Sequence, residues 1–229
     1  MDSTPMYDTI MSLPLFKGVS RERISYFLEK TSISFLKYKS GDIILRHDDE
    51  ITKLRFVISG KIKVINTCKD GLIKISEVRG KGCVIGADRL FGMHTKSGCD
   101  VAAADNTGIM EFSKEQYLNL INADSIYLLN FLNFISLKVQ NAYVAVSDLC
   151  GCSFSVFLAR IVKLYTQRHS ERITIEIDKK YIERMQLTLR DKFESDINIL
   201  STSGAIKRDG NVFDIIDREL LIEYGGLDF

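Results

Sequence analysis

The pattern of apolar positions in residues 124–150 predicts one long helix. The stretch contains neither Pro nor Gly, and its apolar residues are spaced 4, 3, 4, 3, 4 and 3 positions apart. They are Leu128, Leu132, Ile135, Val139, Ala142, Val146 and Leu149. A heptad stripe packs along a second helix, so we interpret this helix as a connector and a dimer interface. A buried core helix of one domain is the alternative, because periodicity does not reveal which chain supplies the partner.

Before this helix, short apolar runs separated by turn residues predict strands. They cover residues 33–38, 42–45, 54–59, 61–66, 72–78, 83–86, 100–104 and 108–112. Ile62 and Val64 alternate with lysines, which is typical of a strand with one buried face. Strands this short and regularly spaced indicate an antiparallel sandwich or barrel. A helix at residues 113–121 follows, and Ser20 is a candidate cap for an earlier helix near the N-terminus.

After the long helix, the pattern changes to helices and a hairpin. An apolar stripe predicts a helix that ends near Arg168, followed by a strand at residues 173–177. Asp178 is placed to cap a short helix, and a second helix runs from about residue 188 to 203. A turn at 207–211 then leads into a strand at 212–215. This order is typical of a winged helix-turn-helix module.

Composition narrows the class of protein. The 229 residues are 45% apolar and carry 31 basic and 30 acidic side chains. The net charge is therefore close to zero and does not by itself indicate a nucleic-acid partner. The N-terminus lacks a signal-peptide pattern, and no apolar run is long enough to span a membrane, which predicts a cytoplasmic protein. Five scattered cysteines favour reduced thiols over a disulfide framework. Cys150 and Cys152 form the only close pair, and we predict no metal there.

Charge is nevertheless unevenly distributed near the C-terminus. Residues 160–192 contain nine basic and five acidic side chains, whereas residues 193–229 contain three basic and eight acidic ones. The local net charges are therefore +4 and −5. A basic surface at the start of the predicted module would contact the phosphates of DNA. Charged side chains that are merely exposed to solvent would give the same numbers of basic and acidic residues.

Several short motifs occur in an order that resembles a known family. They are Leu15-Phe16-Lys17-Gly18, Tyr38-x-x-Gly41-Asp42, the run from Phe56 to Val64, and Gly86-x-x-x-Leu90-Phe91. With the order of elements, they make the whole chain similar to the Crp/Fnr family of bacterial transcription regulators. The resemblance implies an α+β fold with three parts. An effector-sensing antiparallel β-roll, a jelly roll of the cyclic-nucleotide-binding type, covers residues 1–123. A dimerisation helix covers 124–150, and a DNA-binding winged helix-turn-helix covers 151–229.

The resemblance also locates an effector pocket, but the residues there depart from those of cyclic-AMP binders. Such proteins hold the ligand with a Gly-Glu pair, an Arg-Ser pair and two polar positions on the dimer helix. Here these positions are Gly86-Ala87, Ser97-Gly98 and Ala142-Tyr143, which argues against cyclic AMP. A substitute cation for another anion would be Arg89 or Lys96, unless these are ordinary solvated side chains. The candidate pocket comprises Gly86, Ala87, Arg89, Lys96, Ser97, Gly98, Cys99, Ala142 and Tyr143.

The sequence contains few candidate ligands for the other cofactors of the family, which are iron-sulfur clusters and haem. The first 67 residues contain no cysteine, which excludes an N-terminal iron-sulfur cluster. A haem ligand would have to be sought at His94 or Cys99, but a loop histidine is usually just solvated. We therefore predict no cofactor, and an effector other than cyclic AMP or none at all. The Tyr143 ring is a candidate to fill part of the pocket itself.

Alignment with the family's recognition helix places its Arg-Glu-x-x-x-Arg motif on Arg190, Asp191 and Ser195. Arg190 retains the chemistry to read guanine or a phosphate, and Asp191 can accept from cytosine. Leu187 and Leu189 replace the turn glycine and the serine cap, so Thr188 is the remaining candidate cap. The predicted DNA contacts are Arg190, Asp191, Lys192, Thr188 and Ser195, with Lys179, Lys180, Arg184, Lys207 and Arg208 holding phosphates.

Two functions follow from these observations. The first is a dimeric transcription regulator whose partners are double-stranded DNA, a second copy of the chain, RNA polymerase and an unidentified small effector. The second is a ligand-binding or protein-interaction dimer whose degenerate helix-turn-helix no longer reads DNA. Glu194 and Asp196 favour the second, because both lie in the predicted recognition helix near the expected phosphates. Three isolated histidines do not supply a catalytic metal site, so we predict no enzyme.

Overall fold

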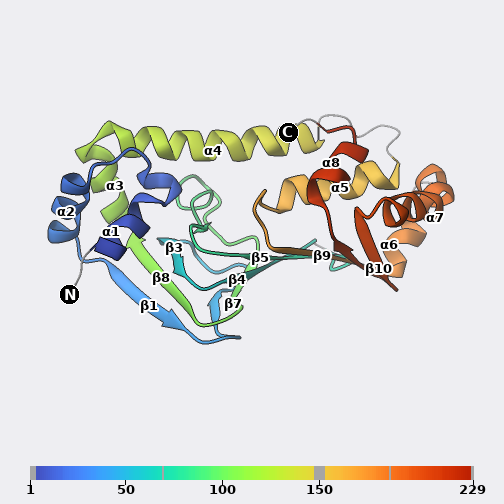
Figure 1. Cartoon of the computed structure of the whole chain (residues 1–229), viewed down its shortest axis with the longest axis horizontal. Helices are drawn as coiled ribbons and strands as arrows, with labels where there is room; N and C mark the ends of the chain where they lie inside the picture. Colours follow the sequence, from blue (N-terminus) through green and yellow to red (C-terminus); the bar gives the residue numbers. More distant parts are fainter. Residues whose placement is uncertain (1–3, 69, 147–152, 186, 228–229) are drawn as a thin grey trace. The chain divides into compact units, whose positions relative to one another are not determined.

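The computed structural model describes residues 4–68, 70–146, 153–185 and 187–227. The fold is α+β with antiparallel sheets, as predicted (Figure 1). The first helices are α1 (Thr4–Met11), the 3-10 turn η1 (Pro14–Phe16) and α2 (Arg21–Lys30). The strands that follow are β1 (Ser34–Tyr38), β2 (Ile43–Leu45), β3 (Lys53–Ser59), β4 (Ile62–Thr67), β5 (Ile73–Arg79), β6 (Val84–Ile85), β7 (Asp100–Ala103) and β8 (Thr107–Ser113).

Helices α3 (Lys114–Ala123) and α4 (Ser125–Val146) come next. The remaining elements are α5 (Phe154–Tyr165), β9 (Arg172–Ile177), α6 (Lys179–Arg184), α7 (Leu187–Thr202), β10 (Ile206–Asp209), β11 (Val212–Ile215) and α8 (Arg218–Tyr224). The predicted caps are confirmed, because Ser20 accepts a hydrogen bond from the backbone of Arg23 and Asp178 accepts one from Lys180. The sequence pattern did not predict helix α8.

By its contacts the chain divides into two compact units. The first unit contains Met1–Lys63 and Gly80–Lys138, and the second contains Val64–Arg79 and Val139–Phe229. These units differ from the domain limits predicted at residues 123 and 150. The hairpin segment 64–79 groups with the C-terminal elements, and helix α4 contributes residues to both units. Each unit is described separately below.

The first unit contains a four-stranded antiparallel sheet with the strand order β1-β8-β3-β6. The pairing register of β3 and β8 accounts for the buried face of this sheet. Leu54 lies opposite Phe112 and Phe56 lies opposite Met110, so alternate residues of the two strands share that face. Phe16 of η1 packs on this face, with ring centroids 5.7 Å from Phe56 and 6.0 Å from Phe112. Aromatic pairs at these distances stabilise the attachment of the N-terminal turn to the sheet.

The second unit is organised around strand β5. Its strands run in the order β10-β11-β9-β5-β4, and β5 pairs with β9 in an antiparallel register from Ile73 opposite Ile177 to Val78 opposite Arg172. A period of two places Ile73 and Ile75 on the same face as the isoleucines of β9. That face is buried against α5 and α7 through a core that includes Phe154, Leu158, Val162, Phe193, Ile197, Leu200 and Phe213.

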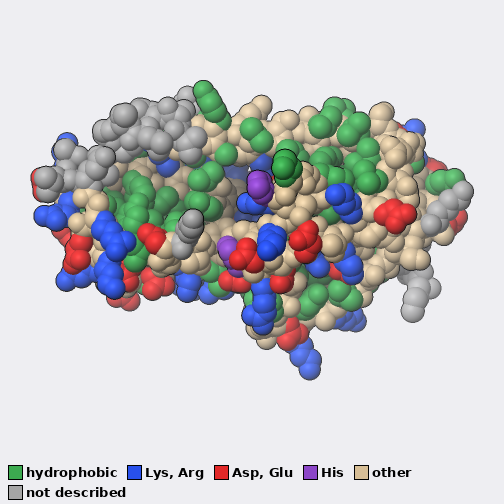
Figure 2. Space-filling view, turned by 180° about the vertical axis from the view of Figure 1, so that it is seen from behind, with side chains coloured by type: hydrophobic (Ala, Val, Ile, Leu, Met, Phe, Trp, Pro, Cys, Tyr) green, Lys and Arg blue, Asp and Glu red, His purple; other side chains and the backbone are tan. Residues whose placement is uncertain are grey.

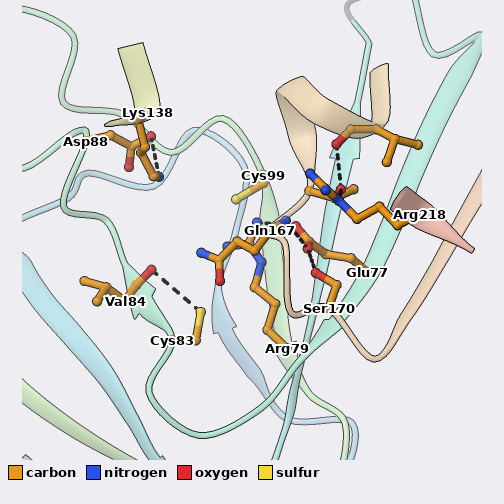
Figure 3. A network of polar contacts seen from close by, with 12 residues as sticks. Glu77, Arg79, Cys83, Val84, Asp88, Cys99, Lys138, Gln167, Ser170 and Arg218 are labelled. Atoms are coloured by element: carbon orange, nitrogen blue, oxygen red, sulfur yellow. Dashed lines mark hydrogen bonds and ion pairs between the residues drawn. The ribbon is translucent and has the colours of Figure 1, made fainter. Parts of the chain in front are cut away.

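The same alternation buries a charge. Glu77 continues the stripe of Ile73 and Ile75, lies opposite Ile173 and is only 1% exposed. Its carboxylate pairs with the Arg79 guanidinium and accepts hydrogen bonds from the Gln167 backbone, at 3.0 Å, and from the Ser170 hydroxyl (Figure 3). A buried carboxylate needs such partners, because desolvation without them costs several kcal/mol. Glu77 therefore joins β5 to the segment that connects α5 and β9.

We expect Glu77→Ala to destabilise the second unit, because the substitution removes the carboxylate that pairs with Arg79 and accepts from Gln167 and Ser170. Breaking a buried ion pair from one side costs about 3 kcal/mol or more of unfolding free energy. Urea denaturation followed by circular dichroism measures the effect. Glu176→Ala on the exposed side of β9 is the matched control and should change stability by less than about 0.5 kcal/mol. Equal midpoints for the two variants would contradict the assigned role of Glu77.

Candidate functional site

The loop of residues 86–99 in the first unit contains most of the predicted effector-pocket residues. Gly86 adopts a positive φ of 83°, and a Cβ atom there would lie 2.9 Å from Ile51, so glycine is required by conformation and by space. Ala87, which occupies the position of the missing glutamate, is buried. The Arg89 backbone N–H donates to the Gly86 carbonyl at 3.2 Å and closes a turn between them.

The end of the loop is held by its own hydrogen bonds. The Ser97 side chain is buried, and its hydroxyl donates to the Cys99 carbonyl at 2.8 Å. The Ser97 backbone N–H donates to the Asp49 carbonyl, and the Ser97 carbonyl accepts from the Asp48 N–H. Lys96 and Glu50 form an isolated antiparallel β-bridge through their backbones. The Ser97 hydroxyl thus serves the loop itself, whereas the Lys96 side chain is exposed.

One guanidinium lies beside the end of this loop. A Cβ atom built on Gly98 would be 3.5 Å from a terminal nitrogen of Arg89, so the Arg89 side chain reaches across the loop to Gly98. Arg89 is exposed. A guanidinium thus lies close to Gly98, although the Ser97-Gly98 sequence itself contains no cation. Gly86, Ala87, Arg89, Ser97, Gly98 and Cys99 belong to the first unit, whereas Ala142 and Tyr143 belong to the second.

Contacts that sequence reasoning missed connect the loop to α4. The Asp88 carboxylate lies 3.4 Å from the Lys138 ammonium (Figure 3), and the rings of Phe91 and Phe131 meet edge to face at 5.4 Å. No local pattern marks Asp88 and Lys138 as partners, since they are fifty residues apart. The loop therefore contacts α4 at two positions, Phe131 and Lys138.

Helix α4 presents its apolar stripe to solvent in the single chain. Leu128, Leu132 and Val139 are exposed, Leu132 by 52%, while Ile135 and Ala142 are half-buried. Hydrophobic side chains appear along the upper edge of the space-filling view, where α4 runs (Figure 2). The Tyr143 ring is 71% exposed. Leu149 and the Val146 side chain lie outside the described residues.

Helix α7 has one buried and one exposed face. Phe193, Ile197 and Leu200 enter the core of the second unit, whereas Arg190, Asp191, Lys192 and Ser195 are exposed. Because the helix begins at Leu187, Thr188 lies within its first turn instead of preceding it, and its side chain is not among those described. The other predicted cations that are exposed are Lys179, Lys180, Arg184 and Lys207.

Asp196 does not lie on the exposed face, and its use as a sign of lost DNA binding was wrong. It is 9% exposed, and its carboxylate accepts from the backbone N–H groups of Phe154, at 2.6 Å, and Ser155, at 3.3 Å. Ser153 caps the next N–H, that of Val156. Asp196 and Ser153 thus satisfy the first three N–H groups of α5, and a carboxylate there also complements the helix dipole. The helical spacing of Phe193, Asp196, Ile197 and Leu200 already placed this acid inward.

Glu194 and Arg208 form an ion pair between α7 and β10. The Arg208 Nη1 lies 2.8 Å from the Glu194 carboxylate, and its Nε donates to the Gly210 carbonyl at 2.9 Å. Arg208, which was predicted to hold a phosphate, is therefore engaged by Glu194 and Gly210 within the protein in this structure.

The described part of the chain contains neither a cluster of metal ligands nor a single membrane-spanning helix. No group of three or more His, Cys, Asp or Glu side chains among these residues is placed to hold a metal ion. Within the same residues no single helix is long and apolar enough to cross a bilayer; α3 and α4 reach that composition only together, across a bend of 119°. Cys68, Cys83 and Cys99 form no disulfides, and burial raises the pKa of Cys68.

Comparisons with known proteins agree with this architecture. Residues 35–124 match the family model of the cyclic nucleotide-binding domain. No curated protein sequence is significantly similar to the chain.

Solved structures show the same fold. The catabolite activator protein of Thermus thermophilus is 17% identical with a TM-score of 0.50, over 93% of this chain and 98% of that one. The sensor domain of the transcriptional regulator DNR from Pseudomonas aeruginosa is 18% identical with a TM-score of 0.53, over 64% of this chain and 98% of that one. A cyclic nucleotide-binding domain from Methylobacillus flagellatus is 15% identical with a TM-score of 0.51, over 63% and 84%. Residues 35–124 thus have the jelly-roll fold of this domain type.

Asp196→Ala should destabilise the second unit, because two N–H groups at the start of α5 lose their acceptor inside the protein. We expect a loss of about 1–3 kcal/mol in the free energy of unfolding. Asp191→Ala is the control on the exposed face of the same helix and should cost less than about 0.5 kcal/mol. Thermal and urea unfolding of both variants check this difference, and similar losses in the two would contradict the capping role.

Proposed function

We propose that the protein is a dimeric, DNA-binding transcription regulator of the Crp/Fnr type. The observation that carries the proposal is the arrangement of α6, α7 and the β10–β11 hairpin. Helix α6 ends at Arg184 and α7 begins at Leu187, so two residues separate them, and an antiparallel hairpin follows α7. This is the order of a winged helix-turn-helix, in which the second helix enters the major groove.

The exposed face of α7 has the chemistry to read bases. Arg190 can donate two hydrogen bonds to guanine, and Asp191 can accept from the cytosine amino group. Lys179, Lys180 and Arg184 on α6 and Lys207 on the hairpin are exposed cations for phosphates. The inward position of Asp196 removes one of the two acids that spoke against DNA binding.

A dimer is proposed from the exposed stripe on α4. Leucines and valine at heptad spacing rarely remain in water along a helix, since each exposed apolar side chain forgoes burial free energy. A second copy of α4 would cover the stripe by the same spacing in both chains. Two modules held in this way would meet two half-sites on DNA.

The sensor half is proposed to bind a small anion other than cyclic AMP, or no effector. Ala87 offers no carboxylate to a ribose, and the buried Ser97 hydroxyl is bonded within the loop. Arg89 beside Gly98 favours an anionic group at that place. The contacts of Asp88 and Phe91 with α4 give such an effector a route to the dimer helix. None of these groups forms a catalytic constellation, so an enzymatic activity is not proposed.

The competing function is a dimer that binds a ligand or protein and no longer reads DNA. Its remaining support is Glu194, which lies on the exposed side of α7. The two functions differ in one measurable property, which is selective enrichment of DNA sequences.

Selection from a pool of genomic fragments should enrich a common, two-fold related sequence with the wild-type protein. Arg190→Ala should weaken binding to that sequence by about 1–3 kcal/mol, because a bidentate contact to one base is lost. Ser201→Ala near the end of α7 is the control. Failure to enrich any sequence, with no effect of Arg190→Ala, would support the competing function.

Leu132→Asp should convert the dimer to a monomer, because a carboxylate would be buried in an apolar helix seam without a partner. Light scattering after size-exclusion chromatography measures the molar mass. Asn133→Asp, an exposed position beside the seam, should remain dimeric. A monomeric wild-type protein at micromolar concentration would refute the proposed interface.

Isothermal calorimetry with cyclic AMP should detect no binding at millimolar ligand, because the pocket lacks the ribose acceptor and the Arg-Ser pair. Arg89→Gln provides the complementary test with any anion that does bind, whose affinity should fall about tenfold or more with loss of the charged contact. Micromolar binding of cyclic AMP would refute the proposed effector class.

A further inference from the structure

The Arg208 side chain is fixed by four contacts within the second unit. Besides the Glu194 carboxylate and the Gly210 carbonyl, its guanidinium lies over the rings of Phe193, at 5.4 Å, and Phe213, at 5.8 Å. Stacking on two aromatic rings orients the planar group toward α7. Only 31% of the side chain is exposed. Arg208 is thus held in place although it lies on the hairpin proposed to approach DNA.

Glu194 stands on the face of α7 proposed to read bases. It follows Arg190 by four residues, so the two side chains are neighbours on the helix surface. Its side chain is 68% exposed, and the carboxylate is therefore accessible from solvent as well as paired with Arg208. In its unpaired state the carboxylate would repel phosphates, whereas it can accept a hydrogen bond from the N4 amino group of cytosine.

We propose that Glu194 is a specificity-determining residue that controls Arg208: the ion pair withholds Arg208 from phosphates on non-specific DNA and opens when a base in the operator engages Glu194. This inference rests on the proposed DNA-binding function. It adds a residue outside the Arg190, Asp191 and Ser195 positions and changes the role of Arg208 from a permanent phosphate ligand to a conditional one.

The physical reason lies in the charges. Affinity for non-specific DNA comes from cations that displace counterions at phosphates, and an arginine neutralised by a carboxylate displaces none. The pair is partly exposed and is therefore weak enough to open when both partners gain new contacts. A matching base pair supplies a donor to Glu194 and frees Arg208 for a phosphate, so the operator gains two contacts that random DNA lacks. The exposed Lys207 contacts phosphates in both states.

The test compares binding to a random-sequence duplex over a range of salt concentrations. The proteins are the full-length wild type, Glu194→Gln, Arg208→Gln, the double variant, and Glu223→Gln, which removes the same charge from the exposed side of α8. Glu194→Gln should steepen the dependence of log affinity on log salt by about 1, which raises affinity about fivefold near 0.15 M salt. Arg208→Gln alone should show no such gain, because it leaves the Glu194 carboxylate unpaired near the phosphates, and the double variant should return to the wild-type slope.

Binding to the sequence selected by the wild-type protein completes the test. Glu194→Gln should narrow the affinity ratio between that sequence and the random duplex, and its own selected sequences should lose preference at one base pair. Glu194 is largely exposed, so its variant retains the fold, and the comparison with Glu223→Gln is decisive even if Arg208→Gln is less stable.

Three results would overturn the inference alone while leaving DNA binding intact. One is a gain in affinity for the random duplex that is as large in Glu223→Gln as in Glu194→Gln. Another is a gain that persists in the double variant. Either result would mean that the gain comes from the change in net charge alone. The third is a slope about 1 lower than that of the wild type in the double variant, which has no Glu194 carboxylate, since Arg208 would then already contact a phosphate in the wild type. No binding of the wild type to any duplex at low salt would instead overturn the proposed function, and this inference with it.

Discussion

Pairing of β5 with β9 is the constraint on which the second unit depends. Six cross-strand pairs bring a segment from the first eighty residues into the sheet of the C-terminal half. The pairing buries isoleucines from both strands against α5 and α7, and burial of this apolar surface contributes to the stability of the unit. Without β5, strand β9 would present an unpaired edge and half of this apolar face to water.

Burial of Glu77 follows from the same pairing. A stripe of alternate residues that begins with Ile73 and Ile75 ends in a carboxylate, and the sheet cannot rotate it outward without exposing the isoleucines. Arg79, Gln167 and Ser170 satisfy the charge instead. The cost of any change in the pairing is therefore high, since it would expose apolar surface and separate a buried charge from its partners. Residues 64–79 are joined covalently at both ends to the first unit, so their place in the second unit links the two halves through the backbone.

The acids of α7 illustrate how one helix serves fold and function with similar side chains. Asp196 faces inward and completes the N-terminus of α5, while Glu194, two residues earlier, faces outward and pairs with Arg208. Their positions differ by about 200° around the helix axis at 3.6 residues per turn. An acidic residue in a DNA-reading helix therefore carries no fixed meaning until its face is known. The same holds for basic residues, because Arg208 is bound within the protein while Lys207 is exposed.

Local features of this protein were determined by the sequence alone. Alternation with a period of two placed the strands up to β9, and β11, to within about two residues, and Ser20 and Asp178 marked helix starts, because each of these signals acts between neighbours in the chain. Strand β10 (Ile206–Asp209) was missed, since most of its residues were predicted as a turn. The heptad stripe predicted the long helix α4, while its role as a dimer interface stays a prediction. Only the tertiary structure decided that β5 pairs with β9, that Arg89 lies beside Gly98, that Asp88 meets Lys138, and that Asp196 caps α5. These contacts join residues far apart in the chain, and an apolar or charged side chain specifies the kind of partner it needs without specifying which one it meets.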